Sequence, residues 1–175
     1  LSKLPSLKNT ISVFDEEKDL TSSFGYKTRN TGLDYSLSYT LNEKTSFFIG
    51  MNYENVNGNS ASSNQSYVTD NIGDFNNFLI DVGFNNIDTN DILYPTSGYS
   101  NRFSITFSPE ELSDDPFYRL VFKNAFYFDR EYSKNFYFIQ NYIGIAESFD
   151  DKLKTANAFS LGGLNFKGFL FRGIG

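Results

Sequence analysis

The sequence predicts an all-β fold, namely part of an antiparallel transmembrane β-barrel with about seven strands. Three observations lead to this prediction. Apolar and polar residues alternate with a period of two in successive segments, most of which are about as long as the 9–11 residues that cross a bilayer as a tilted strand. Short turns alternate with long polar loops, as they do in membrane barrels. Aromatic residues, 20 Phe and 12 Tyr, collect near the segment ends like the interfacial girdles of such barrels.

The first three strands are expected at residues 7–14, 33–41 and 47–53. The second shows the alternation most cleanly, since one of its faces carries Leu33, Tyr35, Leu37, Tyr39 and Leu41. The charged residues 15–29 are expected to form a solvated loop, and residues 42–45 a tight turn. Residues 54–76 are rich in Asn, Ser and Gly and are expected to form a long outer loop. Loops of this length are uncommon in compact soluble domains but routine in membrane barrels.

A hairpin over residues 77–107 is the clearest unit of the pattern. Each of its strands has one largely apolar face, formed by Phe78, Ile80, Val82 and Phe84 on the way in and by Tyr99, Asn101, Phe103, Ile105 and Phe107 on the way out. Its turn consists of Tyr94, Pro95, Thr96, Ser97 and Gly98. Because Pro95 fixes φ and Gly98 accepts a positive φ at no steric cost, the chain is expected to bend tightly there.

Two more strands are expected at residues 117–128 and 135–147, joined by a charged turn at residues 129–134. In the last strand large apolar residues occupy both faces, and we assign its odd positions, such as Ile139 and Ile143, to the lipid side. The acidic segment 108–116 precedes these strands. Its carboxylates offer oxygen ligands for a hard cation, but their spacing differs from that of an EF-hand. A hydrated loop is therefore expected, and no metal site is predicted.

The composition excludes several classes of function. The net charge of -6 argues against nucleic-acid binding, which needs a clustered basic surface. The absence of Cys and His removes thiolate metal sites, the commonest general base and most catalytic constellations, so neither enzymatic activity nor a cofactor is expected. No run of residues approaches the roughly 20 apolar residues of a transmembrane helix. Amphipathic strands are thus the expected elements that meet membrane lipid.

About seven strands do not close a bacterial outer-membrane barrel, whose strand number is even and at least about 8. Lipid tolerates no open sheet edge, because each unpaired backbone polar group costs several kcal/mol there. The chain also begins without Met. We therefore expect a piece of a larger barrel, with further strands on both sides.

Two short motifs resemble those of the bacterial surface antigen superfamily, the outer-membrane assembly factors typified by BamA. The turn at residues 94–98 is similar to the family's Tyr/Phe-Pro-Thr-x-Gly periplasmic turn. The second motif is similar to the Gly-Gly, (Val/Ile)-Arg-Gly-(Phe/Tyr) and Gly-x-Gly-Pro sequences of the family's sixth extracellular loop. It consists here of Gly162, Gly163, Phe166, Lys167, Gly168 and Phe169, followed by residues 173–175.

The resemblance implies a single barrel domain, of which this chain supplies the fifth to eleventh strands of about 16. Residues 1–150 would hold the strands and their loops, and residues 151–175 the long extracellular loop that folds into the lumen. The periplasmic POTRA domains of the family are absent from this chain. In one respect the motif departs from the family, since Lys167 stands where the family has Arg and Phe166 stands in for Val or Ile.

By the resemblance, Lys167 takes the role of the loop Arg, which reaches into the lumen and pairs with acidic residues. The pairing would be looser, because Lys lacks the planar fork of Arg. Arg172 is the alternative lumen cation, and a solvated loop residue is the plain interpretation of Lys167.

The resemblance implies an integral outer-membrane protein of Gram-negative bacteria that folds and inserts β-barrel proteins. Its partners would be membrane lipid, unfolded outer-membrane clients and periplasmic lipoproteins of an assembly complex. Three alternatives stay open: a partner-secretion transporter of the same superfamily, a passive pore, and a soluble β-sandwich with a binding surface. In the pore, the residues that line the lumen would include Asp34, Asp81, Arg102, Arg119 and Lys123.

Overall fold

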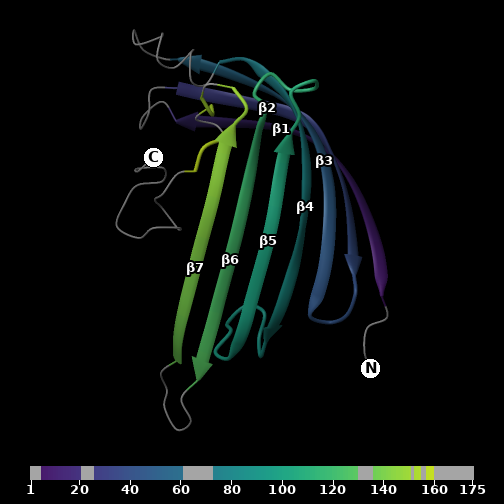
Figure 1. Cartoon of the computed structure of the whole chain (residues 1–175), viewed down its shortest axis with the longest axis vertical. Coiled ribbons are helices and arrows are strands. Elements are labelled where there is room, and N and C mark those ends of the chain that lie inside the picture. Colours follow the sequence, from purple (N-terminus) through teal and green to yellow (C-terminus); the bar gives the residue numbers. More distant parts are fainter. Residues whose placement is uncertain are drawn as a thin grey trace.

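The computed structural model describes residues 5–20, 26–60, 73–129, 136–150, 152–154 and 157–159. These residues form one seven-stranded antiparallel sheet in which each strand pairs with the next along the chain (Figure 1). The strands are β1 (Ser6–Leu20), β2 (Tyr26–Thr40), β3 (Thr45–Ser60), β4 (Phe75–Thr89), β5 (Gly98–Ser108), β6 (Phe117–Asp129) and β7 (Phe136–Ser148). Within the described part of the chain, no helix is long and apolar enough to span a membrane.

The predicted fold class is confirmed. The sheet is open, with β1 and β7 at its two edges, and β4 and β5 form the central hairpin. The assignment of the odd positions of β7 to the apolar face is also confirmed, because Ile143 lies opposite Phe122 of β6 and Ile145 lies opposite Leu120.

The predicted loop at residues 15–29 is wrong over most of its length. β1 runs to Leu20 and β2 starts at Tyr26, while residues 21–25 between them lie outside the described residues. Cross-strand ion pairs replace apolar contacts here. The Arg29 side chain donates from Nε and Nη2 to the two carboxylate oxygens of Asp15, at 2.8 and 2.6 Å. Opposite charges on neighbouring strands stabilise a sheet as apolar pairs do. The two strands therefore continue beyond the residues in which apolar and polar side chains alternate.

The predicted loop at residues 54–76 is also shorter in the structure, for a different reason. β3 continues to Ser60 and β4 begins at Phe75, while residues 61–72 lie outside the described residues. An apolar pair holds this extension, since Val56 lies opposite Phe75 and both side chains are almost fully buried. One large apolar residue among many Asn residues gives no visible alternation, which is why the extension was missed.

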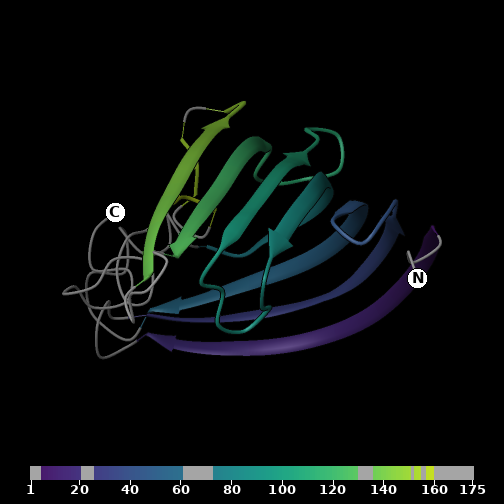
Figure 2. The ribbon, with the colours of Figure 1, turned by 90° about the horizontal axis from the view of Figure 1, so that it is seen from below.

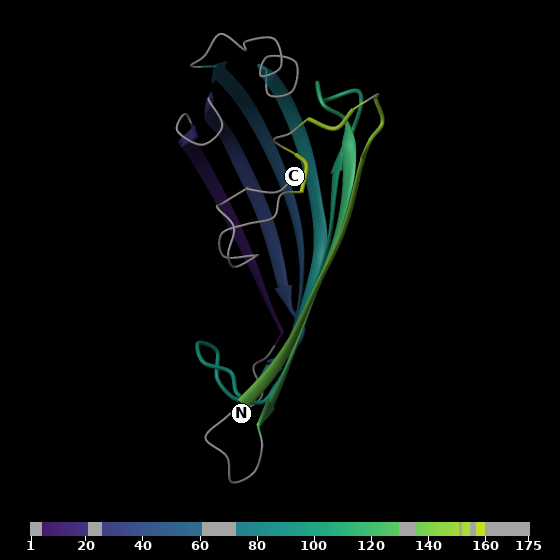
Figure 3. The same ribbon diagram turned by 90° about the vertical axis from the view of Figure 1, so that its left-hand side faces the viewer.

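The sheet is curved like part of a barrel wall (Figures 2 and 3), and the register measures how far its strands lean. Followed straight across the sheet, Ser6 at the start of β1 is in register with Tyr142, which lies six residues after Phe136 at the start of β7. A shift of about one residue per strand, at ~3.3 Å per residue and ~4.8 Å between strands, corresponds to a tilt of about 35°. Transmembrane β-barrels have tilts of roughly 35–45°.

One face of the sheet, called the outer face below, is apolar and exposed. A single row across six strands contains Tyr39, Phe47, Phe84, Phe103, Phe122 and Ile143, and Ile143 is 59% exposed. On β4 this apolar face ends at Asn86 and at Asn76. The ten residue steps from Asn76 to Asn86 span about 33 Å along the strand and about 27 Å in height at the tilt given above. The apolar band of a membrane barrel is ≈ 25 Å tall.

The other face, called the inner face below, is polar and carries several glycines. Three of these glycines lie against a phenylalanine ring: Gly32 against Phe14, Gly83 against Phe48, and Gly144 against Phe159. The first two pairs join neighbouring strands, whereas Phe159 comes from the segment that follows β7. A Cβ atom at any of the three positions would lie within 2.6 Å of the ring, so only glycine admits this packing.

The buried core lies at the long-loop end of the inner face. Its fully buried side chains are Val56, Phe75, Asn77, Ser108 and Phe117. The β5–β6 connection at residues 109–116 is tied to this region, since Asp114 N donates to the carbonyl of Asn76 at 2.8 Å. The remaining inner face is left uncovered by the described residues on the side of the short turns.

Candidate functional site

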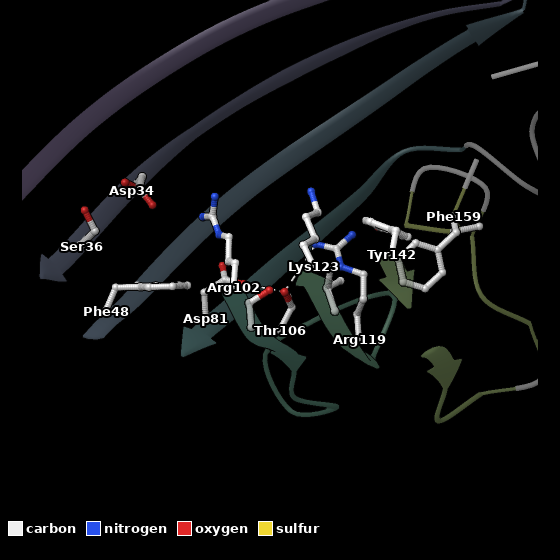
Figure 4. Close-up of a pocket in the computed structure, with 14 residues that line it drawn as sticks. Asp34, Ser36, Phe48, Asp81, Arg102, Thr106, Arg119, Lys123, Tyr142 and Phe159 are labelled. Carbon is white, nitrogen blue, oxygen red and sulfur yellow. Dashed lines mark hydrogen bonds between the residues drawn. The ribbon is translucent and has the colours of Figure 1, made fainter. Parts of the chain in front are cut away.

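The inner face encloses a cavity of about 590 Å³ between β2 and β7 (Figure 4). Its lining includes all five charged residues that the sequence places in a lumen, namely Asp34, Asp81, Arg102, Arg119 and Lys123. Polar and small residues (Ser36, Gly50, Ser104 and Thr106) separate them, and Phe48, Val121, Tyr142, Ala158 and Phe159 complete the wall. This is the polar, hollow side expected of a barrel wall whose other side meets lipid.

The cations of the cavity gather on β5 and β6. Arg102 and Lys123 lie directly opposite each other in the register. Each stands over an aromatic ring: the Arg102 guanidinium carbon is 5.7 Å from the centre of the Phe48 ring, and Lys123 Nζ is 5.1 Å from that of Tyr142. Within the described residues, neither side chain has a carboxylate within the 4.0 Å of an ion pair.

Arg119 is connected to an acid indirectly. Its Nη2 donates to Thr106 Oγ1 at 3.4 Å, and Thr106 Oγ1 donates in turn to Asp81 Oδ1 at 2.5 Å. These three residues belong to β6, β5 and β4 and stand in one row across the sheet. The Asp81 carboxylate is therefore bound by Thr106, which in turn accepts a hydrogen bond from Arg119, rather than by Arg102 or Lys123.

The turn motif at residues 94–98 forms the end of the β4–β5 hairpin. Gly98 has a φ of 107°, as its sequence context predicts, and a side chain there would strike the Asp88 carbonyl. The turn is fixed mainly by two residues that precede the motif. Asn90 Oδ1 accepts hydrogen bonds from the backbone N–H groups of Thr96 and Ser97, at 3.0 and 3.1 Å.

Asp91 is the second of these residues. Its Oδ1 accepts hydrogen bonds from the backbone N–H groups of Leu93 and Tyr94, at 2.7 and 2.8 Å, and these bonds lower the pKa of the Asp91 carboxyl below its ordinary value. Sequence analysis missed both residues, although Asn and Asp before a tight bend are the usual signal of such side-chain-capped turns. The tip that they hold in place is exposed, with Ile92 at 93%.

The acidic segment at residues 108–116 differs in part from the hydrated loop that the sequence predicts. Asp115 is only 3% exposed, and Asn157 Nδ2 donates to its Oδ2. Burial raises the pKa of the Asp115 carboxyl, while the hydrogen bond from Asn157 acts in the opposite direction. The prediction fails for Asp115 because the chain after β7 returns to cover it. Within the described residues, no group of three or more acidic side chains is placed to hold a metal ion.

The motif residues Gly162, Gly163, Phe166, Lys167, Gly168 and Phe169 lie outside the described residues, as does Arg172. The described residues that come nearest in sequence are 157–159. Phe159 lies against Gly144 on the inner face and meets the Tyr142 ring edge-on, with 6.1 Å between the ring centres. The lumen role of the motif residues 162–169 and of Arg172 stays a prediction.

A row of polar residues, four of them Asn, crosses the outer face, and sequence analysis did not identify it. Thr45, Asn86, Asn101, Asn124 and Asn141 occupy successive strands at matching register. Asn86 donates to Thr45 at 2.9 Å, Asn124 to Asn101 at 2.5 Å, and Asn141 to Asn124 at 3.2 Å. We call this row the asparagine ladder. It becomes visible only when the register is known.

An exposed apolar outer face, a polar inner face that encloses a cavity, and strands tilted by about 35° define the wall of a transmembrane β-barrel. Residues 3–175 match the Omp85 superfamily domain, and the chain belongs to this superfamily. The superfamily covers outer-membrane assembly and secretion proteins. Searches of curated proteins and of solved structures returned no match.

Proposed function

We propose that the chain is the barrel wall of an outer-membrane assembly factor of the BamA type, which folds and inserts other β-barrel proteins. The observation that carries the proposal is the Omp85 match over residues 3–175. It is supported by the two sequence motifs at residues 94–98 and 162–169, in the order and at the spacing that this type of protein has.

The mechanism proposed involves no bond chemistry in the client. The barrel thins and perturbs the bilayer, and an edge formed by strands outside this chain pairs with client strands by β-augmentation. The part described here supplies the rigid wall. It also supplies the base of the long loop: Asn157 and Phe159 attach the segment after β7 to Asp115 and to Gly144. Unfolded barrel clients, membrane lipid and periplasmic lipoproteins are the proposed partners.

The experiment that tests the proposal replaces Lys167 in the full-length protein by Ala and, separately, by Arg. The two readouts are heat-modifiable gel mobility of the barrel and the membrane levels of other barrel proteins. If the loop cation braces the lumen of an assembly factor, Ala lowers both readouts and Arg preserves them. If neither substitution changes either readout, Lys167 has no such role and the proposal loses its main mechanistic support.

The second candidate is a partner-secretion transporter of the same superfamily, which exports a polypeptide through its lumen. The cavity of about 590 Å³ with its charged lining is the observation that favours it. In that case, the loss of the full-length protein leaves other barrel proteins at normal levels and abolishes the appearance of one secreted polypeptide outside the cell.

A further inference from the structure

Two like charges face each other inside the cavity. Arg102 on β5 and Lys123 on β6 form a directly opposed pair, which brings their Cβ atoms to about 5 Å. Like charges in this arrangement destabilise a sheet. Figure 4 shows both side chains reaching into the space in front of the strands rather than lying along them. An anion that lies between or beside the two groups would offset their repulsion.

The described acids of the cavity do not supply that anion. Asp81 is on the neighbouring strand but opposite Thr106, four residues along from Arg102, or about 13 Å. Its carboxylate is engaged by Thr106. Asp34 is on β2, three strands from β5, or about 14 Å away across the sheet. Both exceed the reach of an ion pair.

The segment that follows Phe159 does not supply it either. Residues 160–175 contain Lys167 and Arg172 but neither Asp nor Glu. Whatever position this segment takes, it adds positive charge to the chain and no carboxylate side chain. An anion for Arg102 and Lys123 therefore comes from outside this segment and outside the described lining of the cavity, or from solution.

Two aromatic rings restrict the positions of the Arg102 and Lys123 side chains before a ligand binds. Phe48 lies under the guanidinium of Arg102, and Tyr142 lies near the ammonium of Lys123. A cation held over a ring face is attracted by the ring quadrupole, and it has fewer conformations to lose when a ligand binds. The planar fork of Arg102 matches two oxygens of one anion, while Lys123 adds a point charge.

We propose that Arg102 and Lys123, with Phe48 and Tyr142 as their supports, form a binding site for a small oxyanion in the barrel lumen. The ligand class is a phosphate or a carboxylate that carries two or more negative charges. Arg119 lies on the same face of β6, four residues from Lys123, and widens the positive field around the site. The site faces the cavity rather than lipid, so the ligand is a free solute and not a lipid headgroup. This role is separate from the folding of client proteins.

The test uses the full-length protein in detergent and titrates it with inorganic pyrophosphate by calorimetry. The wild-type protein should bind, and Arg102→Gln with Lys123→Gln should weaken binding by about tenfold or more, because each lost charge-assisted hydrogen bond lowers the affinity by about tenfold or more. The matched control is Lys27→Gln with Lys152→Gln, which also removes two positive charges, one from the outer face of β2 and one from the segment after β7. The control should bind like the wild type.

Citrate in place of pyrophosphate separates the two sources of negative charge, since tighter binding of one identifies a phosphate site or a carboxylate site. A second readout does not depend on calorimetry. Pyrophosphate should raise the unfolding temperature of the wild type and of the control pair but leave that of the Arg102→Gln, Lys123→Gln variant unchanged. The proposal is overturned if neither anion binds the wild type, or if the double variant binds as tightly as the control.

Discussion

Asn157 donates its side-chain hydrogen bond to the buried carboxylate of Asp115, across 42 residues of sequence. The contact joins the segment after β7 to the β5–β6 connection and closes the long-loop end of the inner face. Asp115 also donates its backbone N–H to Asn77 Oδ1 at 3.2 Å, and its carbonyl accepts a hydrogen bond from Ser108 at 3.0 Å. Asp115 is thus the point at which three separate parts of the chain meet.

Removal of the Asn157 side chain should loosen this junction. Asn157→Ala removes the side-chain donor from the buried Asp115 carboxylate, and the loss of a hydrogen bond to a buried polar group costs roughly 1–3 kcal/mol. In the full-length barrel we expect a lower unfolding temperature and faster proteolysis between residues 150 and 160. Glu110→Ala, in the exposed part of the same connection, is the control and should change neither. Equal protease resistance of both variants would contradict the junction.

The same junction should depend on pH. Burial raises the pKa of Asp115 above its ordinary value of 3.8. The folded protein then binds the proton more tightly than the unfolded chain, so this group contributes stability that is fully present below pH 3.8 and is lost as the pH rises through the raised pKa. Asp115→Asn should remove this part of the pH dependence. The measurement is the unfolding temperature of both proteins as a function of pH, and parallel curves would rule the effect out.

Asp91 should show the opposite dependence. The backbone N–H groups of Tyr94 and Leu93 lower the pKa of its carboxyl from 3.8. Its contribution is therefore present above pH 3.8 and is lost as the pH falls through the lowered pKa. Asp91→Asn keeps the accepting oxygen and removes the charge, so the turn should persist without this acid sensitivity, whereas Asp91→Ala should loosen the turn at every pH. Hydrogen exchange at Leu93 and Tyr94 reports on the outcome.

Gly144 should tolerate no side chain while Phe159 lies against it. A Cβ at this position would be 2.5 Å from Phe159 Cζ, whereas a Cβ at Gly50 would be 3.6 Å from its nearest neighbour, the Cβ of Asp81. We expect Gly144→Ala to destabilise the barrel by about 1–3 kcal/mol and Gly50→Ala to have little effect.

Phe159→Ala should relieve most of the cost of Gly144→Ala, with a coupling of roughly 0.5–3 kcal/mol between the two sites. Chemical unfolding of the two single variants and the double variant measures this coupling. Additive effects would show that the ring and the glycine do not meet in the full-length protein.

The two faces of the sheet should respond differently to charge. Val82 lies in the middle of the apolar outer face of β4, and Ser36 lies on the inner face of β2. Val82→Arg places a charge against lipid near the bilayer midplane, which costs about 2–4 kcal/mol, whereas Ser36→Arg points into the polar cavity near Asp34. Refolding yield into vesicles should fall for Val82→Arg alone. Equal losses for both variants would argue against the assignment of the faces.

The alternation of residues predicted the faces of the sheet well because each strand has an apolar side that needs lipid. It therefore placed Asp81, Arg102 and Lys123 on one side, where the structure finds the cavity. The same rule could not predict the strand ends. Around Asp15 and Arg29 both faces are polar, and the pairing depends on charges from two strands, which a single strand's pattern does not contain.

The parts of the site that sequence analysis missed depend on distant segments. The burial of Asp115 requires the return of Asn157 after a further strand pair, and the contact of Phe159 with Gly144 requires the same return. Nothing in the sequence around Asp115 or Gly144 indicates that Asn157 or Phe159 will contact it. By contrast, Asn90 and Asp91 belong to a local turn, and their position just before Pro95 carried a usable signal.

The asparagine ladder has a consequence for how the strands find their places. A shift of the register between β5 and β6 by one residue would turn the apolar side chains of one strand to the inner face and its polar side chains to lipid. The contact with lipid is enough to disfavour such a shift. A slip of two residues would keep every apolar side chain toward lipid, so alternation gives no protection against it. Such a slip would set Asn101 opposite Phe122 or Phe126 and leave its amide without a partner in an apolar setting, at a cost of several kcal/mol. The asparagine ladder thus disfavours shifts of the register by two residues. It would act when neighbouring hairpins pair in the membrane.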